Sequence, residues 1–149
     1  MFVRAGGMWG EWSWQPTDRR RWLTWAGLAG AGAALIMAVA GLPPVDLHGV
    51  LHHFGIMDPA CGGTRAARLA ARGQWSAAWN YNPLGIAAVA AAAVVTVRAA
   101  VGFVSGRWLD VVIVWTPRRR RAAIWVAVVL LVALEIRQQL RADLLTHRP

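Results

Sequence analysis

The chain contains no lysine, only one cysteine and few acidic residues: all 16 basic residues are arginine, against seven aspartates and glutamates. A single cysteine excludes an internal disulfide framework and a zinc site built on several thiolates. Charged residues make up only 15% of the sequence, whereas a soluble domain carries about 25%. These scarcities exclude an intrinsically disordered chain and an ordinary soluble enzyme.

What the chain has in abundance is apolar sequence. Hydrophobic residues account for 57% of its 149 residues, and the mean hydropathy is +0.40. The length is that of a single domain, and the formal net charge is +9. A nucleic-acid-binding protein can carry that charge but not this much apolar sequence, so we expect no nucleic acid as a partner. The composition predicts that the chain lies in a lipid bilayer.

Three apolar stretches are predicted to cross the membrane, at residues 22–42, 83–106 and 122–138. The first has 21 uncharged residues, which as a helix span about 31 Å, close to the hydrocarbon thickness of about 30 Å. The second carries Arg98 as its only charge, near its far end, where a long side chain can snorkel to the interface. The third has only 13 uncharged residues, 122–134, so an interfacial helix is the alternative. We therefore expect an all-α integral membrane protein with three transmembrane helices and a short interfacial or re-entrant helix between the first two.

The remaining segments are predicted to lie outside the bilayer core. Residues 1–21 form a polar lead rich in Trp and Arg. This lead is either an interfacial anchor, because indole rings prefer the headgroup level, or a loose terminus. Residues 43–82 are expected to form an ordered outer segment, 107–121 a basic loop in which Pro117 breaks the chain, and 139–149 a polar tail.

A cleaved signal peptide is the alternative interpretation of the first apolar run. Arg19–Arg21 resemble its basic n-region, and Ala38-Val39-Ala40 fits a cleavage site between small residues. The run is longer than the apolar region of about 7–15 residues that signal peptides have. The transmembrane helix is therefore the preferred interpretation.

The distribution of arginine predicts a cytoplasmic N-terminus, because cytoplasmic loops of membrane proteins carry an excess of basic residues. With that orientation, nine arginines lie inside: Arg4, Arg19, Arg20, Arg21, Arg107, Arg118, Arg119, Arg120 and Arg121. Six lie outside: Arg65, Arg68, Arg72, Arg137, Arg141 and Arg148. The segment 43–82 then faces outward.

A polar motif in this outer segment contains the candidate chemistry. It reads Cys-Gly-Gly-Thr-Arg over residues 61–65. Thr64 is a favourable N-cap for a short helix over residues 65–72. Three arginines share one face of that helix, because they are three and seven residues apart: Arg65, Arg68 and Arg72. An Asn82-Pro83 pair then turns the chain into the second span.

This segment resembles the domain of unknown function 2752 family, which comprises small bacterial multi-pass membrane proteins. The family's hallmark is Cys-Pro-x-Cys-Gly-x-Thr-Arg, followed by a short helix and an Asn-Pro that enters the next span. The matching residues are Cys61, Gly62, Thr64, Arg65, Asn82 and Pro83. Asp58 stands at the position of the family's first Cys, so a Cys-x-x-Cys pair is absent. The resemblance implies a multi-pass protein of the bacterial inner (plasma) membrane with a shared site, and it implies no known activity.

Among the functional interpretations of the motif, anion binding at the start of the short helix is the favoured one. Backbone N–H groups and the positive end of the helix dipole attract a phosphate, and a lipid headgroup is the nearest source. Glu135, near the outer end of the third span, is a candidate partner for Arg65 or Arg68. The alternative is that the arginines solvate the outer face or pair with Glu135 and Asp58. The predicted site comprises Cys61, Gly62, Gly63, Thr64, Arg65, Arg68, Arg72, Asn82 and Glu135.

We therefore expect a non-enzymatic accessory protein or subunit that binds a membrane partner or an anionic lipid headgroup, with no catalytic residue and no cofactor. Small residues on the first two spans predict a homo- or hetero-oligomer with other membrane helices. The alternative is a membrane-embedded thiol- or metal-dependent enzyme centred on Cys61, His52 and Arg65. Weak candidate ligands for zinc are His48, His52, Asp58 and Cys61.

Overall fold

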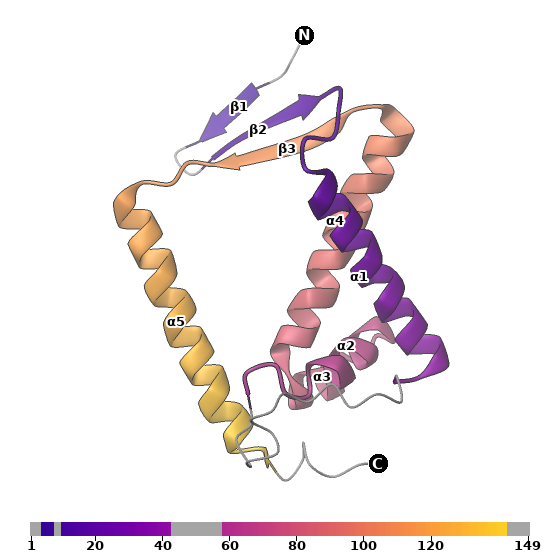
Figure 1. The fold of residues 1–149 in the computed structure, drawn as a ribbon, viewed down its shortest axis with the longest axis vertical. Helices are drawn as coiled ribbons and strands as arrows, with labels where there is room; N and C mark the ends of the chain where they lie inside the picture. The colour runs from indigo at the N-terminus through magenta and orange to yellow at the C-terminus, as the bar shows by residue number, and fades with distance from the viewer. Residues whose placement is uncertain (1–3, 8–9, 43–57, 143–149) are drawn as a thin grey trace.

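The structure, a computed structural model, describes residues 4–7, 10–42 and 58–142. Within these ranges the protein is mostly helical, with a small sheet at one end of the helices (Figure 1). The helices are α1 (Arg21–Ala40), α2 (Gly63–Ala71), α3 (Trp75–Tyr81), α4 (Pro83–Ser105) and α5 (Pro117–Gln139). The strands are β1 (Arg4–Gly7), β2 (Gly10–Gln15) and β3 (Trp108–Ile113).

The all-α membrane fold predicted from the sequence is confirmed. Helices α1, α4 and α5 have 20, 23 and 23 residues, and each is long and apolar enough to cross a membrane. The short helices α2 and α3 lie between the first two spans in the chain and at the opposite end of the molecule from the sheet (Figure 1). Within its described residues, 58–82, the segment between the first two spans contains two short helices, where one was predicted.

The third span begins earlier than predicted. Residues 107–121 were expected to be a loop broken at Pro117, but Pro117 is the first residue of α5. Proline fits this position because the first turn of a helix needs no N–H from it and its fixed φ is already helical. The Thr116 side chain caps the helix by accepting a hydrogen bond from the Arg119 N–H at 3.3 Å. Four arginines, residues 118–121, therefore belong to the first turns of the helix. The helix has 23 residues, so it is longer than its 13 uncharged residues alone would allow.

Helices α1 and α4 pack directly against each other. A Cβ atom added at Gly27 of α1 would collide with the side chain of Val95 on α4, so the two backbones approach closely there. Small residues allow this approach in membrane helices, where packing rather than hydrophobic burial drives association. Helix α5 stands apart from this pair along most of its length and approaches it near the α3 end (Figure 1).

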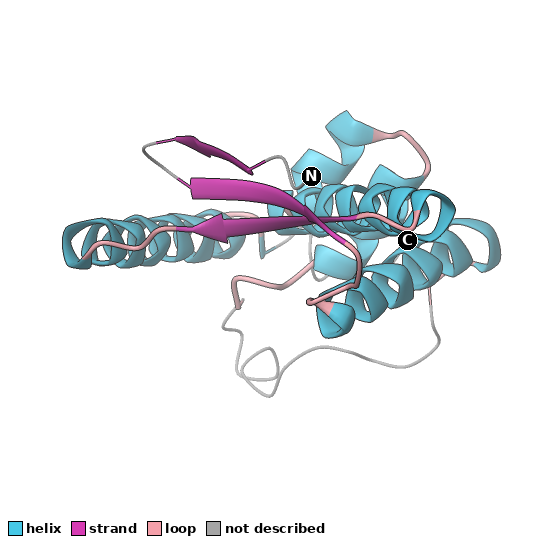
Figure 2. Ribbon diagram, turned by 90° about the horizontal axis from the view of Figure 1, so that it is seen from above, coloured by secondary structure: helices cyan, strands magenta, loops and turns pink. Residues whose placement is uncertain are grey.

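The small sheet is a feature that the sequence analysis did not predict. Strands β1, β2 and β3 form an antiparallel sheet in that order. The register places Ser13 opposite Asp110 and Trp14 opposite Leu109. The sheet therefore joins strands of the polar lead to residues 108–113, part of the segment that was expected to be a basic loop (Figure 2).

A buried ionic network lies beneath the sheet. The Arg98 guanidinium on α4 donates to Asp18 Oδ1 and to Thr24 Oγ1, each at 2.9 Å, and to the Leu109 carbonyl at 2.7 Å. The Arg98 side chain is only 13% exposed, so it is held by protein partners and does not extend into water as predicted. Arg20 makes a second ion pair, with Asp110, at 2.8 Å.

Candidate functional site

The motif at residues 58–65 forms a tight turn that leads into α2. The Asp58 carboxylate accepts a hydrogen bond from the Ala60 N–H at 2.7 Å, and the Asp58 carbonyl accepts one from Cys61 at 3.0 Å. Gly62 has a φ of 74° and is the N-cap of α2, a left-handed conformation that glycine adopts without strain. Thr64 lies inside the helix and makes no side-chain cap, so its predicted role as the N-cap is wrong. Asp58, at the position of the family's first Cys, stabilises the turn.

Asn82 joins the two halves of the sequence motif. Its side-chain amide donates to the carbonyls of Pro59 and Cys61, at 2.9 and 2.8 Å. Its Oδ1 accepts a hydrogen bond from the Leu84 N–H at 2.8 Å, which caps α4. The residue is fully buried. The Cys-Gly-Gly-Thr-Arg turn and the Asn-Pro turn, 21 residues apart in the chain, are therefore one structural unit.

Helix α2 lies directly on the first turns of α4. A Cβ added at Gly85 would lie 2.5 Å from the Gly63 carbonyl oxygen and 2.8 Å from the Ala67 nitrogen, so only glycine fits at this crossing. The buried alanines Ala66 and Ala70 of α2 pack with Ala78 of α3. Small residues thus hold α2 and α3 against α4 and turn the charged face of α2 away from it.

The three predicted arginines of α2 lie in different environments. The Arg65 guanidinium lies 5.8 Å from the centre of the Tyr81 ring. Arg68 is half-buried, and its Nε is a buried donor with no acceptor among the described residues. Arg72 is exposed at the C-terminal cap of α2. Of the three, Arg68 has the least satisfied side chain.

The end of α5 and the turn after it contribute two further arginines and a glutamine to this end of the molecule, which the sequence analysis did not include in the site. Arg137, Gln138 and Arg141 donate to the carbonyls of three consecutive residues at the end of α3. These carbonyl acceptors belong to Trp79, Tyr81 and Asn80, respectively. Cations are favoured at a helix C-terminus because its terminal carbonyls are unsatisfied and its dipole is negative there.

The polar atoms of this α5–α3 contact are incompletely satisfied. Arg137 Nη1 is a buried donor without an acceptor among the described residues, and Gln138 Oε1 is a buried acceptor without a donor. Glu135, the predicted partner of Arg65 or Arg68, is half-buried on α5 just before this contact. The sequence signal for this contact was the pair Arg137 and Arg141, which are four residues apart and so lie on one side of the helix end, but this spacing identifies no acceptor.

Cys61 lies in an environment that favours the neutral thiol. Burial raises the pKa of Cys61, and the negative charges of Asp58 and Glu135 raise it further. The charge of Arg65 and a hydrogen bond from the Gly62 backbone act in the opposite direction but do not compensate. A reactive cysteine requires a lowered pKa, so this geometry does not favour a nucleophilic role.

The predicted metal ligands are only partly within the described residues. His48 and His52 lie outside them. Within 4–7, 10–42 and 58–142, no group of three His, Cys, Asp or Glu side chains is arranged to hold a metal ion. Asp58 and Cys61 are adjacent in the turn, where the Asp58 carboxylate accepts a backbone hydrogen bond.

The fold and site together define a small multi-pass α-helical membrane protein with an arginine-rich interfacial end. Residues 50–96 match the model of the family described as "Protein of unknown function (DUF2752)", which supports the resemblance that the motif indicated. The match covers both halves of the motif joined by Asn82. No curated protein and no solved structure shows significant similarity to the chain.

Proposed function

We propose that the protein is a non-enzymatic membrane subunit that binds the phosphate of an anionic lipid headgroup at the α2–α3–α5 end. The observation on which the proposal depends is two unsatisfied donors, Arg68 Nε and Arg137 Nη1, which are buried and have no acceptor in the part of the chain that the structure describes. A buried donor without a partner costs about 1–3 kcal/mol, and more when it is charged. A phosphate oxygen would remove that cost.

The charge at this end supports an anionic ligand. Among the described residues it holds five arginines against two acids, Asp58 and Glu135. The arginines are Arg65, Arg68, Arg72, Arg137 and Arg141. The short helices are packed across the start of a span, and phosphates of lipid headgroups lie where a span begins, which supports a lipid as the source of the anion. Arginine suits them because its planar guanidinium matches phosphate geometry.

We propose that this end faces outward from a bacterial plasma membrane, with the N-terminus in the cytoplasm. The positive-inside rule supports this orientation, because the sheet end carries the clusters at residues 19–21 and 118–121. The anionic lipid is then in the outer leaflet. A thiol- or metal-dependent enzyme is the weaker alternative, because the pKa of Cys61 is raised.

The test is lipid retention by the purified full-length protein, measured by native mass spectrometry with phosphatidylglycerol and phosphatidylcholine as probes. We expect wild type to retain phosphatidylglycerol preferentially and the Arg68→Gln/Arg137→Gln variant to lose at least one bound molecule. Arg107→Gln removes an exposed charge at the sheet end and is the matched control. Equal retention by all three proteins would contradict the proposal.

A second candidate function, binding of a partner helix, is supported by the isolation of α5. Large apolar side chains cover it on all sides: Ile124, Trp125, Val126, Val129, Leu130, Leu131 and Val132 are each at least half exposed. We propose that one face of α5 packs against the same helix of another copy. Single cysteines scanned over residues 126–132, in a Cys61→Ser background, should cross-link with a helical period of about 3.6 residues. Uniform absence of cross-links would contradict this candidate.

A further inference from the structure

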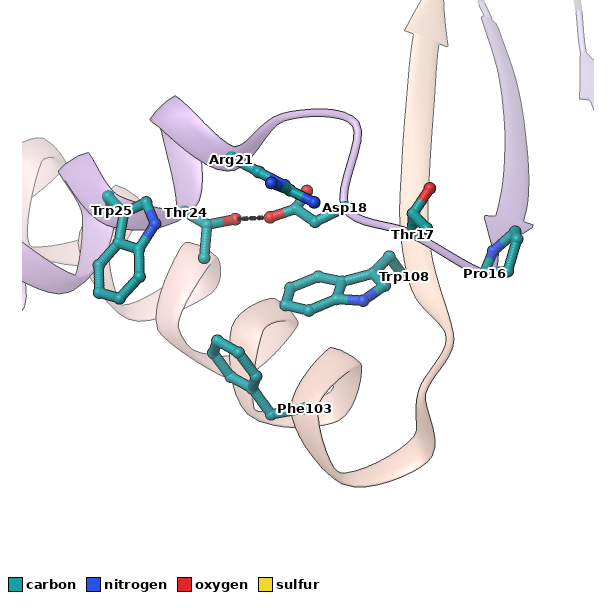
Figure 3. Close-up of a pocket in the computed structure, with 8 residues that line it drawn as sticks. All are labelled: Pro16, Thr17, Asp18, Arg21, Thr24, Trp25, Phe103 and Trp108. Atoms are coloured by element: carbon teal, nitrogen blue, oxygen red, sulfur yellow. Dashed lines mark hydrogen bonds between the residues drawn. The ribbon is translucent and has the colours of Figure 1, made fainter.

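A cavity lies at the opposite end of the molecule from the α2–α3–α5 end, where the turn after β2 meets the start of α1 and the end of α4. It has a volume of about 370 Å³, within the range of about 300–1,000 Å³ typical of ligand sites. The residues of its lining that matter here are Thr17, Asp18, Arg21, Trp25, Phe103 and Trp108 (Figure 3).

The acid in this cavity is already satisfied. Asp18 accepts hydrogen bonds from Thr24 Oγ1 at 2.6 Å and from the Arg98 guanidinium at 2.9 Å. Burial raises the pKa of Asp18, but these bonds, one from the Arg20 N–H and the charge of Arg98 outweigh it, so the pKa is lowered overall. The carboxylate stays ionised and is neutralised by Arg98. It is therefore not a site for a cation.

One lining charge remains uncompensated. Arg21 is exposed and forms no ion pair with a described residue. The nearby acid Asp110 is already paired with Arg20. The balance of charge around the cavity is therefore positive, and Arg21 and the Thr17 hydroxyl can donate hydrogen bonds to a ligand. The ligand should be anionic and rich in acceptors.

The walls of the cavity are aromatic. Phe103 and Trp108 meet edge to face, with ring centres 5.0 Å apart, and Trp108 lies against the bare backbone of Gly102. Trp25 follows one turn after Arg21 on α1 and is 66% exposed. Because α1 begins and α4 ends here, these rings lie at the level where a span meets the headgroups. An anionic group on an apolar chain matches both the charge and the walls.

We infer that this cavity binds the phosphate of an anionic phospholipid in the leaflet next to the sheet, with Arg21 as the ion-pairing residue and the acyl region against Trp25 and Phe103. This site shares no residue with the α2–α3–α5 end and does not rest on the function proposed for it. The same phosphate chemistry is offered by free inorganic phosphate, so the test separates the two sources.

The test compares Arg21→Gln with Arg19→Gln in the full-length protein purified in neutral detergent. Both remove one exposed arginine from the same basic cluster, but only Arg21 lines the cavity. We expect Arg21→Gln to bind phosphatidylglycerol about tenfold more weakly at one site, the size of a lost charge-assisted hydrogen bond, and Arg19→Gln to bind as wild type does. Equal binding by the two variants would overturn the inference.

Two further arms identify the ligand and the site. Trp25→Ala should weaken phosphatidylglycerol binding without changing the response to inorganic phosphate, measured as a shift in thermal midpoint. If inorganic phosphate alone stabilises the protein as strongly as phosphatidylglycerol does, and through Arg21, the lipid assignment is wrong. The Arg68→Gln/Arg137→Gln variant should keep the Arg21-dependent binding. Loss of lipid binding at the α2–α3–α5 end is thereby distinguished from loss of lipid binding in the cavity at Arg21.

Discussion

Asn82 stabilises the interfacial end through one buried amide. Its nitrogen holds the carbonyls of Pro59 and Cys61, and its oxygen caps α4. The amide nitrogen donates to carbonyl acceptors, and the amide oxygen accepts from an N–H donor. An ionised carboxylate has no donor and an aliphatic side chain has neither group, so neither could replace the amide. The sequence predicts the Asn-Pro turn, but it does not predict that the turn and the cysteine motif touch, because that contact joins residues 21 positions apart.

Substitution of this amide should destabilise the whole interfacial end. Asn82→Ala removes the helix cap and leaves two carbonyls buried without a donor, so we expect a loss of about 2–5 kcal/mol in the free energy of unfolding. The measurement is the thermal midpoint in detergent. Asn80→Ala is the control, since Asn80 is exposed and its side chain makes a single long hydrogen bond with the described residues, 3.4 Å from Arg141. Similar midpoints for the two variants would contradict this role.

The thiol of Cys61 gives a second residue-scale prediction, on pH. Because its pKa is raised, thiolate forms only above the pH at which an ordinary cysteine ionises. The rate of alkylation by iodoacetamide should therefore rise at higher pH than for a cysteine placed at exposed Ala71 in a Cys61→Ser background. Asp58→Asn removes a charge that opposes ionisation and should move the Cys61 profile to lower pH. An unshifted Cys61 profile, or a shift of the opposite sign in Asp58→Asn, would show the assignment to be wrong.

At the scale of elements, the long helices were predictable and the sheet was not. Spans of about 20 apolar residues are determined by bilayer thickness, so composition alone locates them. Strands β2 and β3 lie almost 100 residues apart in the chain and meet only because α1 and α4 return to the same end. Likewise, the sequence marked Arg98 as the only charge in its span but did not identify Asp18 and Thr24 as its partners.

The close crossing of α2 over α4 depends on Gly85, which has no side chain to separate the two backbones. In Gly85→Ala the new Cβ would meet backbone atoms of α2 that cannot rotate away, so we expect α2 to shift and stability to fall by about 1–3 kcal/mol. Gly32→Ala is the matched control, because nothing lies within 4 Å of its Cβ position on α1 and alanine is the better helix former. Thermal midpoints of both variants test this. A Gly85→Ala protein as stable as Gly32→Ala would show that the helices do not touch as described.

The whole molecule has two polar ends separated by apolar helices. One end holds the sheet and the Asp18–Arg98 network, and the other holds the turn at Asn82 and the arginines of α2 and α5 (Figure 1). The sequence alone located the residues of α2 in the site. It did not include Arg137 and Arg141, because nothing in a linear pattern shows that α5 ends against α3.

The central claim is that these two ends lie on opposite sides of a membrane, and single-cysteine labelling in intact cells tests it most directly. In a Cys61→Ser background, cysteines replace exposed Gln74, between α2 and α3, and exposed Arg107, between α4 and β3. A membrane-impermeant maleimide should label Gln74→Cys in intact spheroplasts and Arg107→Cys only after permeabilisation. Labelling of both positions from the same side would contradict the spanning arrangement, and the reverse pattern would contradict the cytoplasmic N-terminus.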